Sequence, residues 1–544
     1  MNERLMKDFT NNEIMEAFNQ MDPMKAPGID KPIDMTNFCL ISLCRVVYKI
    51  VAKVLANRLK DTLPMCISQN QSAIVPKRMI HDNILIAHEL VHYLQSAKNR
   101  PNKGFAIKLD MSKAYDRVEW KFIEEVMHNM GYADAWVIKI MSYVCSVKNK
   151  SPFFFVDDAL LFIRNKKRDV EEIVNIINKF ISVSGQKINN VKSMIMFSPK
   201  TLLVERHIFC SMLGMRMVDA LDRYLGLPLP IKRKKSAAFT NIINRCTCKV
   251  NSWSKCLLSY GGKEMFLKAI LQSKPTYAFS VFLAPKGTIE ELYSKMSRMW
   301  WTKNEKTRVW NMMAGDRLCY PKRMGGIGFR DMHLFNLALL GRQVWRLINF
   351  NDTLCFKVLS AKYFPEGDMF RPKLCDKPLF TWTSIAKAAK ALNDGFIWQV
   401  GDGNTIEIQW DHWVIEGLNG DSICRPLLTN DEKKVNNLWY QDQKRWKRDK
   451  VIKLYGREIG ECICNLLIPT NDVKDIRTWL QNPHGVYTSK SAYSWLSLKR
   501  IGFGPHRLFW RIIWKFKMLP KIKVFSRRIG CHILPTYTNI ARIR

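Results

Sequence analysis

Two apolar stretches of the chain contain acidic residues at places where strands are expected. Residues 105–107 (FAI) lead to Asp110, and residues 153–162 (FFFVDDALLF) surround Asp157 and Asp158. Phe and Val favour strands while carboxylates need water or a cation, so the second stretch predicts a hairpin with an acidic tip. If a strand ending at Asp110 pairs with this hairpin, all three acids meet at one edge of a sheet.

Other segments have the periodicity of amphipathic helices. Apolar residues between 123 and 130 recur at spacings of three, four and seven, and the pattern stops at Gly131. This pattern predicts one helix, and a second is expected roughly over 133–147. Segments 263–271 and 289–301 have the same periodicity with basic residues on the outer face, which predicts two further helices.

A turn is expected later in the chain. The tetrapeptide GDGN at 401–404 lies between the runs 397–400 and 405–408, and this arrangement predicts a hairpin. Its glycines are too few for a phosphate-binding loop.

The charge of the chain points to a polyanionic partner. The 544 residues include 86 Lys and Arg against 48 Asp and Glu, a formal net charge of +38. This excess is larger than solubility requires, and binding to a nucleic acid should therefore weaken steeply with salt. With 47% hydrophobic residues, a chain of this length has enough apolar surface for three or four domains.

The charge is also uneven along the chain. No acidic residue follows Asp475, whereas residues 476–544 contain 14 Lys or Arg. Aromatic residues alternate with these bases, and Trp510 and Trp514 share one face of an expected helix. Such a segment either pairs with phosphates and stacks on bases, or forms a core helix with solvated basic flanks; both interpretations stay open.

Three carboxylates at one sheet edge would suit Mg²⁺. This ion prefers oxygen ligands and takes part of its shell from one or two carboxylates and from substrate phosphates. A two-ion site of this kind performs phosphoryl transfer. An isolated Asp-Asp pair more often indicates a solvated turn, so the interpretation depends on the wider pattern of the chain.

That wider pattern resembles a known family. The motifs that carry the resemblance are KLDMSKAYDRV at 108–118, FVDD at 155–158, SGQKIN at 184–189 and YLGLP at 224–228, with ISLC at 41–44, the segment 51–60 and NQSAIVPKR at 70–78 upstream. They are similar to motifs of the reverse transcriptases of non-LTR, LINE-type retrotransposons, most closely those of plants. The resemblance implies an α+β chain: a right-hand polymerase fold with fingers, palm sheet and helical thumb, followed by a mostly helical C-terminal region.

The resemblance also assigns catalytic residues. Asp110, Asp157 and Asp158 match the carboxylates that hold Mg²⁺ in a two-ion site. Lys192 matches a lysine near the incoming triphosphate that would donate a proton to pyrophosphate. A solvated surface lysine is an equally good interpretation of Lys192. The implied partners are an RNA template, a DNA primer and deoxynucleotide triphosphates.

Two further residues match substrate-binding positions of the family. Tyr115 matches the aromatic steric gate that crowds the 2′-hydroxyl of a ribonucleotide, with a core tyrosine as the alternative. Arg78 matches a fingers arginine that would contact triphosphate or template backbone, for which a planar guanidinium is well suited.

The chain departs from the family pattern at two places. Asp157 follows Asp110 by only 47 positions, and the two expected helices fill most of that interval. A Gly-Gln-Gly-Asp-Pro-like turn and its supporting helix, normally found there, are missing, and the motif KAPGID at 25–30 lacks the long stretch that normally follows it. These gaps indicate a decayed or internally deleted element, or an open reading frame joined across missing sequence. In a polymerase that lacks the supporting helix, a misplacement of about 1 Å can cost on the order of a hundredfold in rate.

The expected domains follow from the resemblance. They are a fingers remnant or disordered segment at 1–35, internally deleted fingers and palm at 36–200, the palm end and helical thumb at 201–300, a connecting region at 301–475, and a truncated zinc-binding-like domain at 476–544. In the last of these, the run GVYTSKS at 485–491 resembles the start of the zinc-binding domain that follows plant LINE reverse transcriptases. The Cys and His ligands of that domain normally come later, so no zinc is assigned.

Cysteine usage and hydropathy predict the cellular compartment of the protein. The 15 cysteines occur without a signal peptide or a short disulfide framework, which favours a reducing, nuclear or cytoplasmic location over secretion. No uncharged run of about 18 apolar residues is present, so no membrane partner is expected.

The function expected from the resemblance is RNA-directed DNA synthesis in a degenerate copy. A catalytically dead nucleic-acid-binding remnant is the alternative, because charge and fold do not require intact chemistry. An intron maturase-like splicing factor, which shares palm and thumb, is a third possibility.

Overall fold

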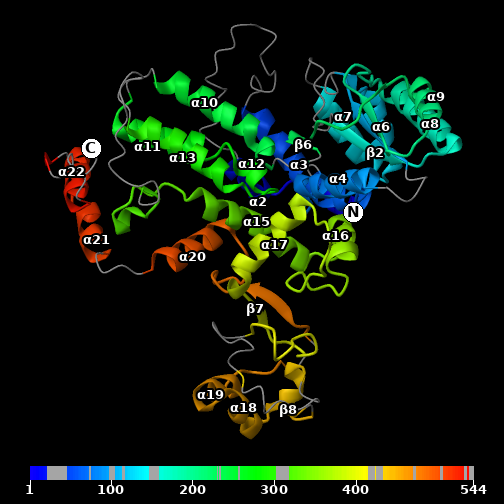
Figure 1. Cartoon of the computed structure of the whole chain (residues 1–544). Helices are drawn as coiled ribbons and strands as arrows, with labels where there is room; N and C mark the ends of the chain where they lie inside the picture. Colours follow the sequence, from blue (N-terminus) through cyan, green and yellow to red (C-terminus); the bar gives the residue numbers. More distant parts are fainter. Residues whose placement is uncertain are drawn as a thin grey trace. The chain divides into compact units, whose positions relative to one another are not determined.

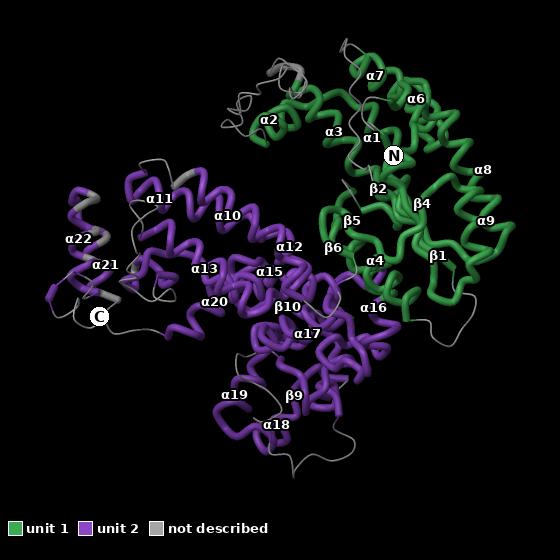
Figure 2. The backbone as a smooth tube through the Cα atoms, turned by 45° about the horizontal axis from the view of Figure 1, so that its top comes forward, with its two compact units in different colours: residues 1–230, 353–358 green, residues 231–352, 359–544 purple. Residues whose placement is uncertain are grey.

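The computed structural model divides the chain into two compact units. Unit 1 comprises residues 1–230 and 353–358, and unit 2 comprises residues 231–352 and 359–544 (Figure 2). Each unit is described by itself. The described residues are 1–20, 46–72, 75–96, 104–112, 117–145, 158–229, 231, 235–254, 258–301, 318–413, 423, 433–440, 442–469, 473–502, 507–531, 534 and 536–537.

A four-stranded sheet lies at the centre of unit 1, with strand order β2-β1-β3-β4. Its strands are β1 (Phe105–Asp110), β2 (Asp158–Ile163), β3 (Met194–Phe197) and β4 (Arg216–Met217). β1 is antiparallel to both β2 and β3, and β3 is parallel to β4. The predicted pairing of the two acidic strands is confirmed, because Asp110 lies opposite Asp158.

The side chains of β1 alternate between the two faces of the sheet, and each face packs into a different apolar core. Phe105, Ile107 and Leu109 face the core formed with α8 (Lys167–Ser184) and α9 (Leu203–Leu213). Ala106 faces the opposite core, formed with α4 (Ile80–Gln95) and the segment 221–229. Successive strand side chains point to opposite faces, so Lys108 and Asp110 share the α4 side with Ala106.

The other described helices of unit 1 include four that share a third apolar cluster. These four are α1 (Asn2–Met6), α3 (Val46–Cys66), α6 (Trp120–Asn129) and α7 (Asp134–Cys145), and α2 (Asn11–Asn19) packs against α3. Leu5, Leu55, Met127 and Trp136 are buried together there. The two helices expected between Asp110 and Asp157 are confirmed (Figure 1): α6 begins three residues before the periodic pattern, and α7 begins one residue after the predicted start.

Arg58 of α3 attaches the N-terminal segment to this helical cluster. Its guanidinium donates to the carbonyls of Leu5, Lys7 and Asp8 and forms an ion pair with Glu13, at 2.8 Å. The hydrogen bond from Arg58 lowers the pKa of the Glu13 carboxyl to about 2. A buried guanidinium is tolerated here because its donors are satisfied.

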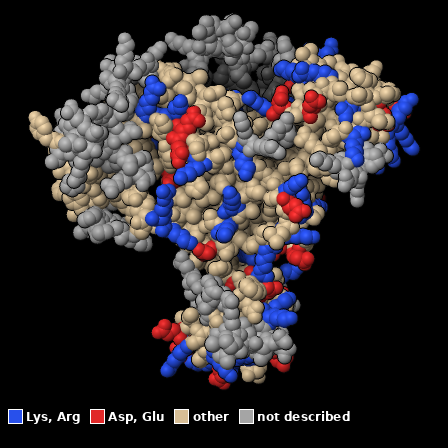
Figure 3. Space-filling model, in the orientation of Figure 1, with Lys and Arg blue, Asp and Glu red and all other residues tan. Residues whose placement is uncertain are grey.

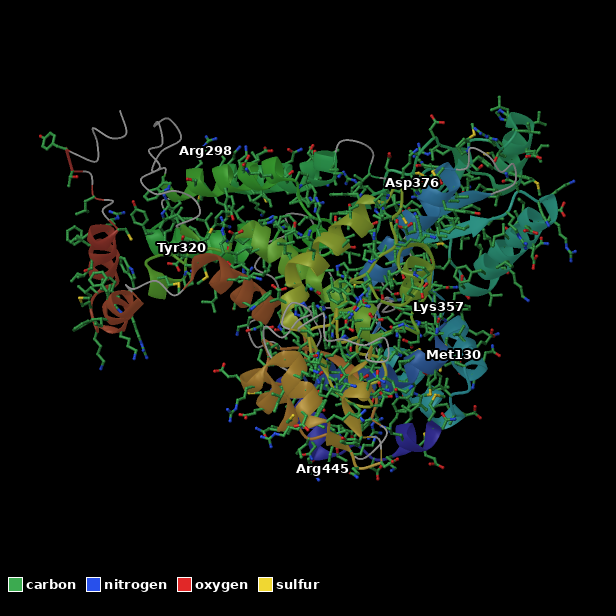
Figure 4. All side chains as sticks on the ribbon, turned by 60° about the horizontal axis from the view of Figure 1, so that its bottom comes forward. Met130, Arg298, Tyr320, Lys357, Asp376 and Arg445 are labelled. Atoms are coloured by element: carbon green, nitrogen blue, oxygen red, sulfur yellow. The ribbon has the colours of Figure 1, made fainter. Side chains whose placement is uncertain are left out.

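Unit 2 begins with helices at the two segments where periodicity predicted them. Its first helices are α10 (Thr240–Ser254), α11 (Tyr260–Phe266) continuing as a π-helix (Leu267–Leu271), α12 (Thr276–Phe279) and α13 (Lys286–Trp301). Met299 and Trp300 are buried while Arg298, labelled in Figure 4, is exposed. The amphipathic pattern of α13 is thereby confirmed.

Three helices pack together in the middle of unit 2. They are α15 (Met332–Asn349), α17 (Phe380–Leu392) and α20 (Ser489–Ile501). Between α15 and α17 in the sequence lies α16 (Leu354–Tyr363), whose residues up to 358 are assigned to unit 1. α15 packs against both α17 and α20. Gly341 makes this close packing possible, because a Cβ at its position would lie 2.1 Å from the Tyr487 hydroxyl, which donates to the carbonyl of Ala338.

The hairpin predicted around residues 401–404 is wrong. β7 (Phe396–Gln399) pairs with β10 (Ile476–Trp479), almost eighty residues later, and not with 405–408. The loop instead surrounds the carboxylate of Asp475, which accepts hydrogen bonds from the main-chain N–H groups of Gly401, Gly403 and Thr405. The carboxylate of Asp475 thus accepts the hydrogen bonds of this glycine loop. The local sequence around the loop does not predict that contact.

A smaller cluster and two terminal helices complete unit 2. The elements are β8 (Trp439–Tyr440), β9 (Arg445–Trp446), α18 (Arg448–Tyr455), α19 (Arg457–Cys464), α21 (Arg507–Lys515) and α22 (Pro520–Gly530). Trp413 and Trp439 are buried in this cluster. Trp510 of α21 is also buried, against Gly325 and Gly530, as expected for a core helix; the side chain of Trp514 lies outside the described residues.

The surface carries charges of both signs. Figure 3 shows Lys and Arg side chains over much of the visible face, with Asp and Glu among them. None of the helices in the described ranges is long and apolar enough to cross a membrane.

Candidate active site

Asp110 lies at the end of β1, where the core on that face of the sheet stops. Ala106 is buried under α4, but Lys108 and Asp110, two and four residues further along the same face, are partly exposed. The register sets Asp158 opposite Asp110 on β2. The side chains of Asp157 and Asp158 lie outside the described residues, so of the three predicted acids the structure describes the carboxylate of Asp110 alone.

The segment 185–193 holds the main chain around Asp110. The N–H of Asp110 donates to the Ser193 hydroxyl at 3.0 Å, and its carbonyl accepts from the N–H of Asn189 at 2.8 Å. The N–H of Ser112 donates to the carbonyl of Lys187 at 2.8 Å. Ser193 is fully buried. The motif SGQKIN and the residues that follow it therefore fix the end of β1 by hydrogen bonds on both sides of the acid.

Gly185 lets this segment approach residues 117–119. It ends α8 with a φ of 71°, the left-handed region that favours glycine. A Cβ at this position would lie 2.7 Å from the carbonyl oxygen of Arg117 and 2.8 Å from the Glu119 side chain. The glycine of the motif is thus required both by backbone conformation and by space.

A pocket of about 540 Å³ opens beside Asp110. Its lining consists of Lys108, Asp110, Lys192, Met194, Arg216, Asp222 and Arg223. Four cations and two acids line it, so the pocket as a whole favours an anionic ligand that also carries a cation. Lys192 is exposed at its rim, on the loop that positions Asp110, and the structure brings these two predicted residues together.

The motif YLGLP forms a tight hairpin that supplies one wall of the pocket. β5 (Arg223–Tyr224) pairs with β6 (Leu227–Pro228) through two turn residues with positive φ, Leu225 at 48° and Gly226 at 79°. Tyr224 and Leu227 are buried against the sheet. Their burial places the neighbouring Arg223 at the pocket.

His88 connects α4 to this hairpin. Its side chain is 3% exposed and hydrogen-bonds to the main chain at Pro228, which offers only its carbonyl oxygen as acceptor. Burial lowers the pKa of His88 to about 4, and this hydrogen bond opposes the shift. The imidazole is therefore neutral at pH 7.

Sequence reasoning missed Lys108, Arg216, Asp222 and Arg223. Lys108 could have been found from strand periodicity, because it lies two residues before Asp110 on the same face. Arg223 immediately precedes the recognised YLGLP motif. Arg216 carries no such signal, since its position follows from the parallel pairing of β4 with β3.

Arg78 has main-chain partners. Its guanidinium donates to the carbonyls of Pro64, Ile67, Ser68 and Gln71, at 3.3, 2.9, 2.5 and 2.9 Å. These carbonyls lie at and just after the end of α3, so the side chain closes that helix end. A contact between Arg78 and a nucleotide stays a prediction. The nucleotide would have to share the guanidinium N–H donors with these carbonyls.

The carboxylate oxygens at this site are the type of ligand that a divalent cation such as Mg²⁺ prefers. Asp110 and Asp222 both line the pocket, and the register brings Asp158 opposite Asp110. The described residues alone form no cluster of three metal-ligating side chains. A complete ligand set would need the side chains of Asp157 and Asp158. Tyr115, the predicted steric gate, also lies outside the described residues.

Comparison with known proteins identifies the domain around this site. Residues 27–154 match the family described as reverse transcriptase (RNA-dependent DNA polymerase). The matched region contains α3, α4, β1, α6 and α7, and with them Asp110. It ends three residues before Asp157.

Three relatives extend the comparison. A protein of Arabidopsis thaliana named for ribonuclease H is 25% identical over 318 residues, which is 56% of this chain and 50% of that protein. An uncharacterized mitochondrial protein of Arabidopsis thaliana is 34% identical over 143 residues, 26% of this chain and 93% of that protein. An uncharacterized 149 kDa protein of transposon TX1 from Xenopus laevis is 34% identical over 117 residues, 21% of this chain and 9% of that protein.

The extent of these matches differs. The chain spans about half the length of the first relative and nearly all of the second. The domain match indicates a reverse transcriptase, and one of the relatives is a transposon protein. The chain thus belongs to the same family as the uncharacterized mitochondrial protein and carries a reverse transcriptase domain of the retrotransposon type.

Proposed function

We propose that this chain is an RNA-directed DNA polymerase of a plant LINE-type retrotransposon, in a form weakened by internal deletion. The observation that carries the proposal is the antiparallel pairing of β1 with β2, which sets Asp110 opposite Asp158 beside a basic pocket. The reverse transcriptase match over residues 27–154 supports it independently.

The proposed substrates are deoxynucleotide triphosphates, an RNA template and a DNA primer. Lys108, Lys192, Arg216 and Arg223 would bind the triphosphate, since charge-assisted contacts to phosphate are strong when the cations converge. Lys192 would also donate a proton to the leaving pyrophosphate. The excess of basic residues elsewhere in the chain would bind template and primer backbones.

Asp110, Asp157 and Asp158 would hold Mg²⁺ during the reaction. When bound, a pair of such ions activates the primer hydroxyl and neutralises charge on the transferred phosphate. The protein's contribution is placement: Ser193 and Asn189 fix the main chain of Asp110 on both sides. A fixed main chain reduces the rearrangement that this acid needs when it binds a ligand.

The proposed deletion concerns the interval between β1 and β2. α6 and α7 occupy residues 120–145 and pack with α1 and α3, which leaves 146–157 as the rest of the connection. An element that supports template and nucleotide would have little chain to form from there. We therefore expect slow nucleotide addition.

Primer extension on an RNA template tests this function. With Mg²⁺ and deoxynucleotides, we expect slow extension that Asp110→Asn abolishes. Asp134→Asn is the matched control, because this aspartate lies on α7 with a side chain 85% exposed. Extension by the control but not by Asp110→Asn would support the proposal.

The alternative has a distinct outcome. A nucleic-acid-binding remnant would bind the same primer-template tightly at low salt, without extension by the wild-type chain. Equal extension by the wild type and by Asp110→Asn would contradict the assignment of the site itself.

A further inference from the structure

Unit 2 contains a large pocket far from Asp110 in sequence and outside the region matched to reverse transcriptases. Its volume is about 980 Å³. It lies between one face of α17, strand β7 and the segments 368–378 and 410–412. The aromatic side chains in its lining are Phe370, Trp382, Phe396, Trp398 and Trp410.

Trp410 is the aromatic residue of this pocket that faces solvent. Its side chain is 61% exposed, whereas Trp382 is buried. The main chain around it is held firmly: the N–H of Trp398 donates to the carbonyl of His412 at 2.8 Å, and the N–H of Glu407 donates to the carboxylate of Asp411 at 2.8 Å. A large exposed indole on a fixed segment is a suitable surface for stacking.

The arginines of the pocket are used by the fold. Arg371 pairs with Glu407 and Asp411, at 2.5 and 3.0 Å. Arg477 pairs with Asp368 and Asp411, at 3.0 and 3.2 Å, and stacks over the rings of Phe370 and Trp398. The acids in the floor of the pocket are therefore neutralised by these two guanidinium groups.

Unlike the arginines, the lysines of the pocket are not used in ion pairs with its acids. Lys373, Lys387 and Lys390 are exposed, and no carboxylate of the described residues pairs with them. Lys387 and Lys390 are three residues apart on α17, so they project from one face of the helix. The third acid of the lining, Asp394, pairs with Lys499 at 2.5 Å. The rim is thus positive. Figure 3 shows Lys and Arg side chains over the part of unit 2 that carries α17 in Figure 1.

We propose that this pocket binds single-stranded nucleic acid, with a base stacked on Trp410 and backbone phosphates at Lys387 and Lys390. Stacking needs an unpaired base, and every base offers a ring face to an indole. Lysines at one helix face match successive phosphates of an extended strand. Asn393 and His412, whose side chains lie 3.3 Å apart in the same pocket, offer polar groups to a base edge.

A duplex or a free nucleotide fits these features less well. A duplex keeps its bases stacked on each other, so Trp410 would contribute nothing. A single nucleotide would fill only part of about 980 Å³. A single strand uses both the aromatic and the basic parts of the lining.

Photocrosslinking with the full chain tests the site directly. Oligomers of 5-iodouridine and of 5-iododeoxyuridine, 20 nucleotides long, are irradiated with the protein, and the crosslinked peptides are mapped by mass spectrometry. We expect a major crosslink in a peptide that contains Trp410. Comparison of the two oligomers shows whether the site takes RNA, DNA or both.

Variants then assign the roles. Trp410→Ser should reduce the crosslink yield about tenfold, within the range for one stacked base, whereas Trp410→Phe should retain most of it. The double variant Lys387→Ser, Lys390→Ser should weaken the dependence of the yield on salt. Tyr440→Ser, an aromatic residue 53% exposed in the same unit, and the pair Lys450→Ser, Lys453→Ser are matched controls expected to have little effect.

The outcomes separate this site from the polymerase site. A chain carrying Asp110→Asn should crosslink through Trp410 as the wild type does, whatever its polymerase activity. Crosslinks confined to other peptides, equal losses in the control variants, or equally effective competition by unlabelled duplex would each overturn the proposal.

Discussion

At the scale of single residues, main-chain hydrogen bonds hold the acid of the candidate site in place. Asp110 has a carboxylate at a pocket, but its N–H and carbonyl are both used, by Ser193 and Asn189. A carboxylate on a fixed main chain has fewer orientations to lose when it binds a ligand. The hydroxyl of Ser193 is buried and cannot touch a substrate. Ser193 is therefore a positioning residue, which acts through the main chain of Asp110.

Removing that hydroxyl should loosen the end of β1. Ser193→Ala leaves the N–H of Asp110 without its acceptor, which typically costs about 1–3 kcal/mol in the free energy of unfolding. We expect faster amide hydrogen exchange at Asp110 and a lower urea midpoint. Ser182→Ala, an exposed serine of α8 that bonds to the carbonyl of Lys179, is the control and should change stability by less than about 0.5 kcal/mol. Equal effects of the two substitutions would show that the Ser193 bond is not important.

His88 should make the stability of unit 1 depend on pH. Its pKa is lowered to about 4 in the folded chain, from about 6.5 when unfolded. Below pH 6.5 the unfolded chain binds a proton that the folded chain does not, so stability falls as the pH drops towards 4. Between pH 7 and pH 5 the loss should be about 2 kcal/mol.

Urea unfolding at the two pH values measures this loss. His88→Gln keeps a donor for the carbonyl of Pro228 but does not titrate, so its stability should change less between pH 7 and pH 5. His128→Gln, at a partly exposed histidine, is the control and should behave as the wild type. An identical pH response in His88→Gln and the wild type would exclude His88 as its cause.

At the scale of elements, Gly185 links α8 to the segment that holds Asp110. Gly214 ends α9 in a similar left-handed conformation, with a φ of 64°, but a Cβ there would meet nothing within 4 Å. Gly214→Ala therefore measures backbone strain, about 1–2 kcal/mol. Gly185→Ala adds a clash with the carbonyl of Arg117, and we expect it to destabilise the protein by at least about 1 kcal/mol more. Thermal unfolding of both variants gives the comparison; equal shifts would mean that the chain relaxes around Gly185.

Several elements could be predicted because their signals are local. The periodicity before Gly131 gave α6, and the apolar runs beside Asp110 and Asp158 gave two strands that do pair. The family resemblance also predicted Lys192 at the site, and Lys192 and Asp110 line the same pocket. In each case a repeating pattern of a few residues, or a recognised motif, carries the information.

Other features depend on contacts between distant residues. β7 pairs with β10 because the loop between 401 and 405 closes on Asp475, which is seventy positions away. Ser193 bonds to Asp110 over 83 positions, and the pattern around Ser193 resembles that of any buried strand start. Arg78 has a surface-like sequence context, yet its guanidinium closes the end of α3. No local rule distinguishes these arrangements from their alternatives.

At the scale of the whole molecule, the charge is concentrated in one part of the chain. Residues 231–544 contain 54 Lys and Arg against 24 Asp and Glu, which is +30 of the total +38. Residues 1–230 contain 32 against 24. The part of the chain with Asp110, Asp157 and Asp158 is therefore only weakly basic, and we expect most electrostatic attraction to a nucleic acid to come from the remainder.

This distribution predicts strongly salt-dependent binding. Each phosphate neutralised by Lys or Arg releases condensed counterions, and six such contacts weaken binding about a thousandfold between 50 and 200 mM salt. We expect a loss of at least this size for a primer-template duplex, measured by fluorescence anisotropy. An oligomer of the same sequence with an uncharged backbone is the control, because it has no counterions to release. A decrease of less than about tenfold for the charged duplex would mean that few of the basic residues meet phosphates, and that the excess charge serves another purpose.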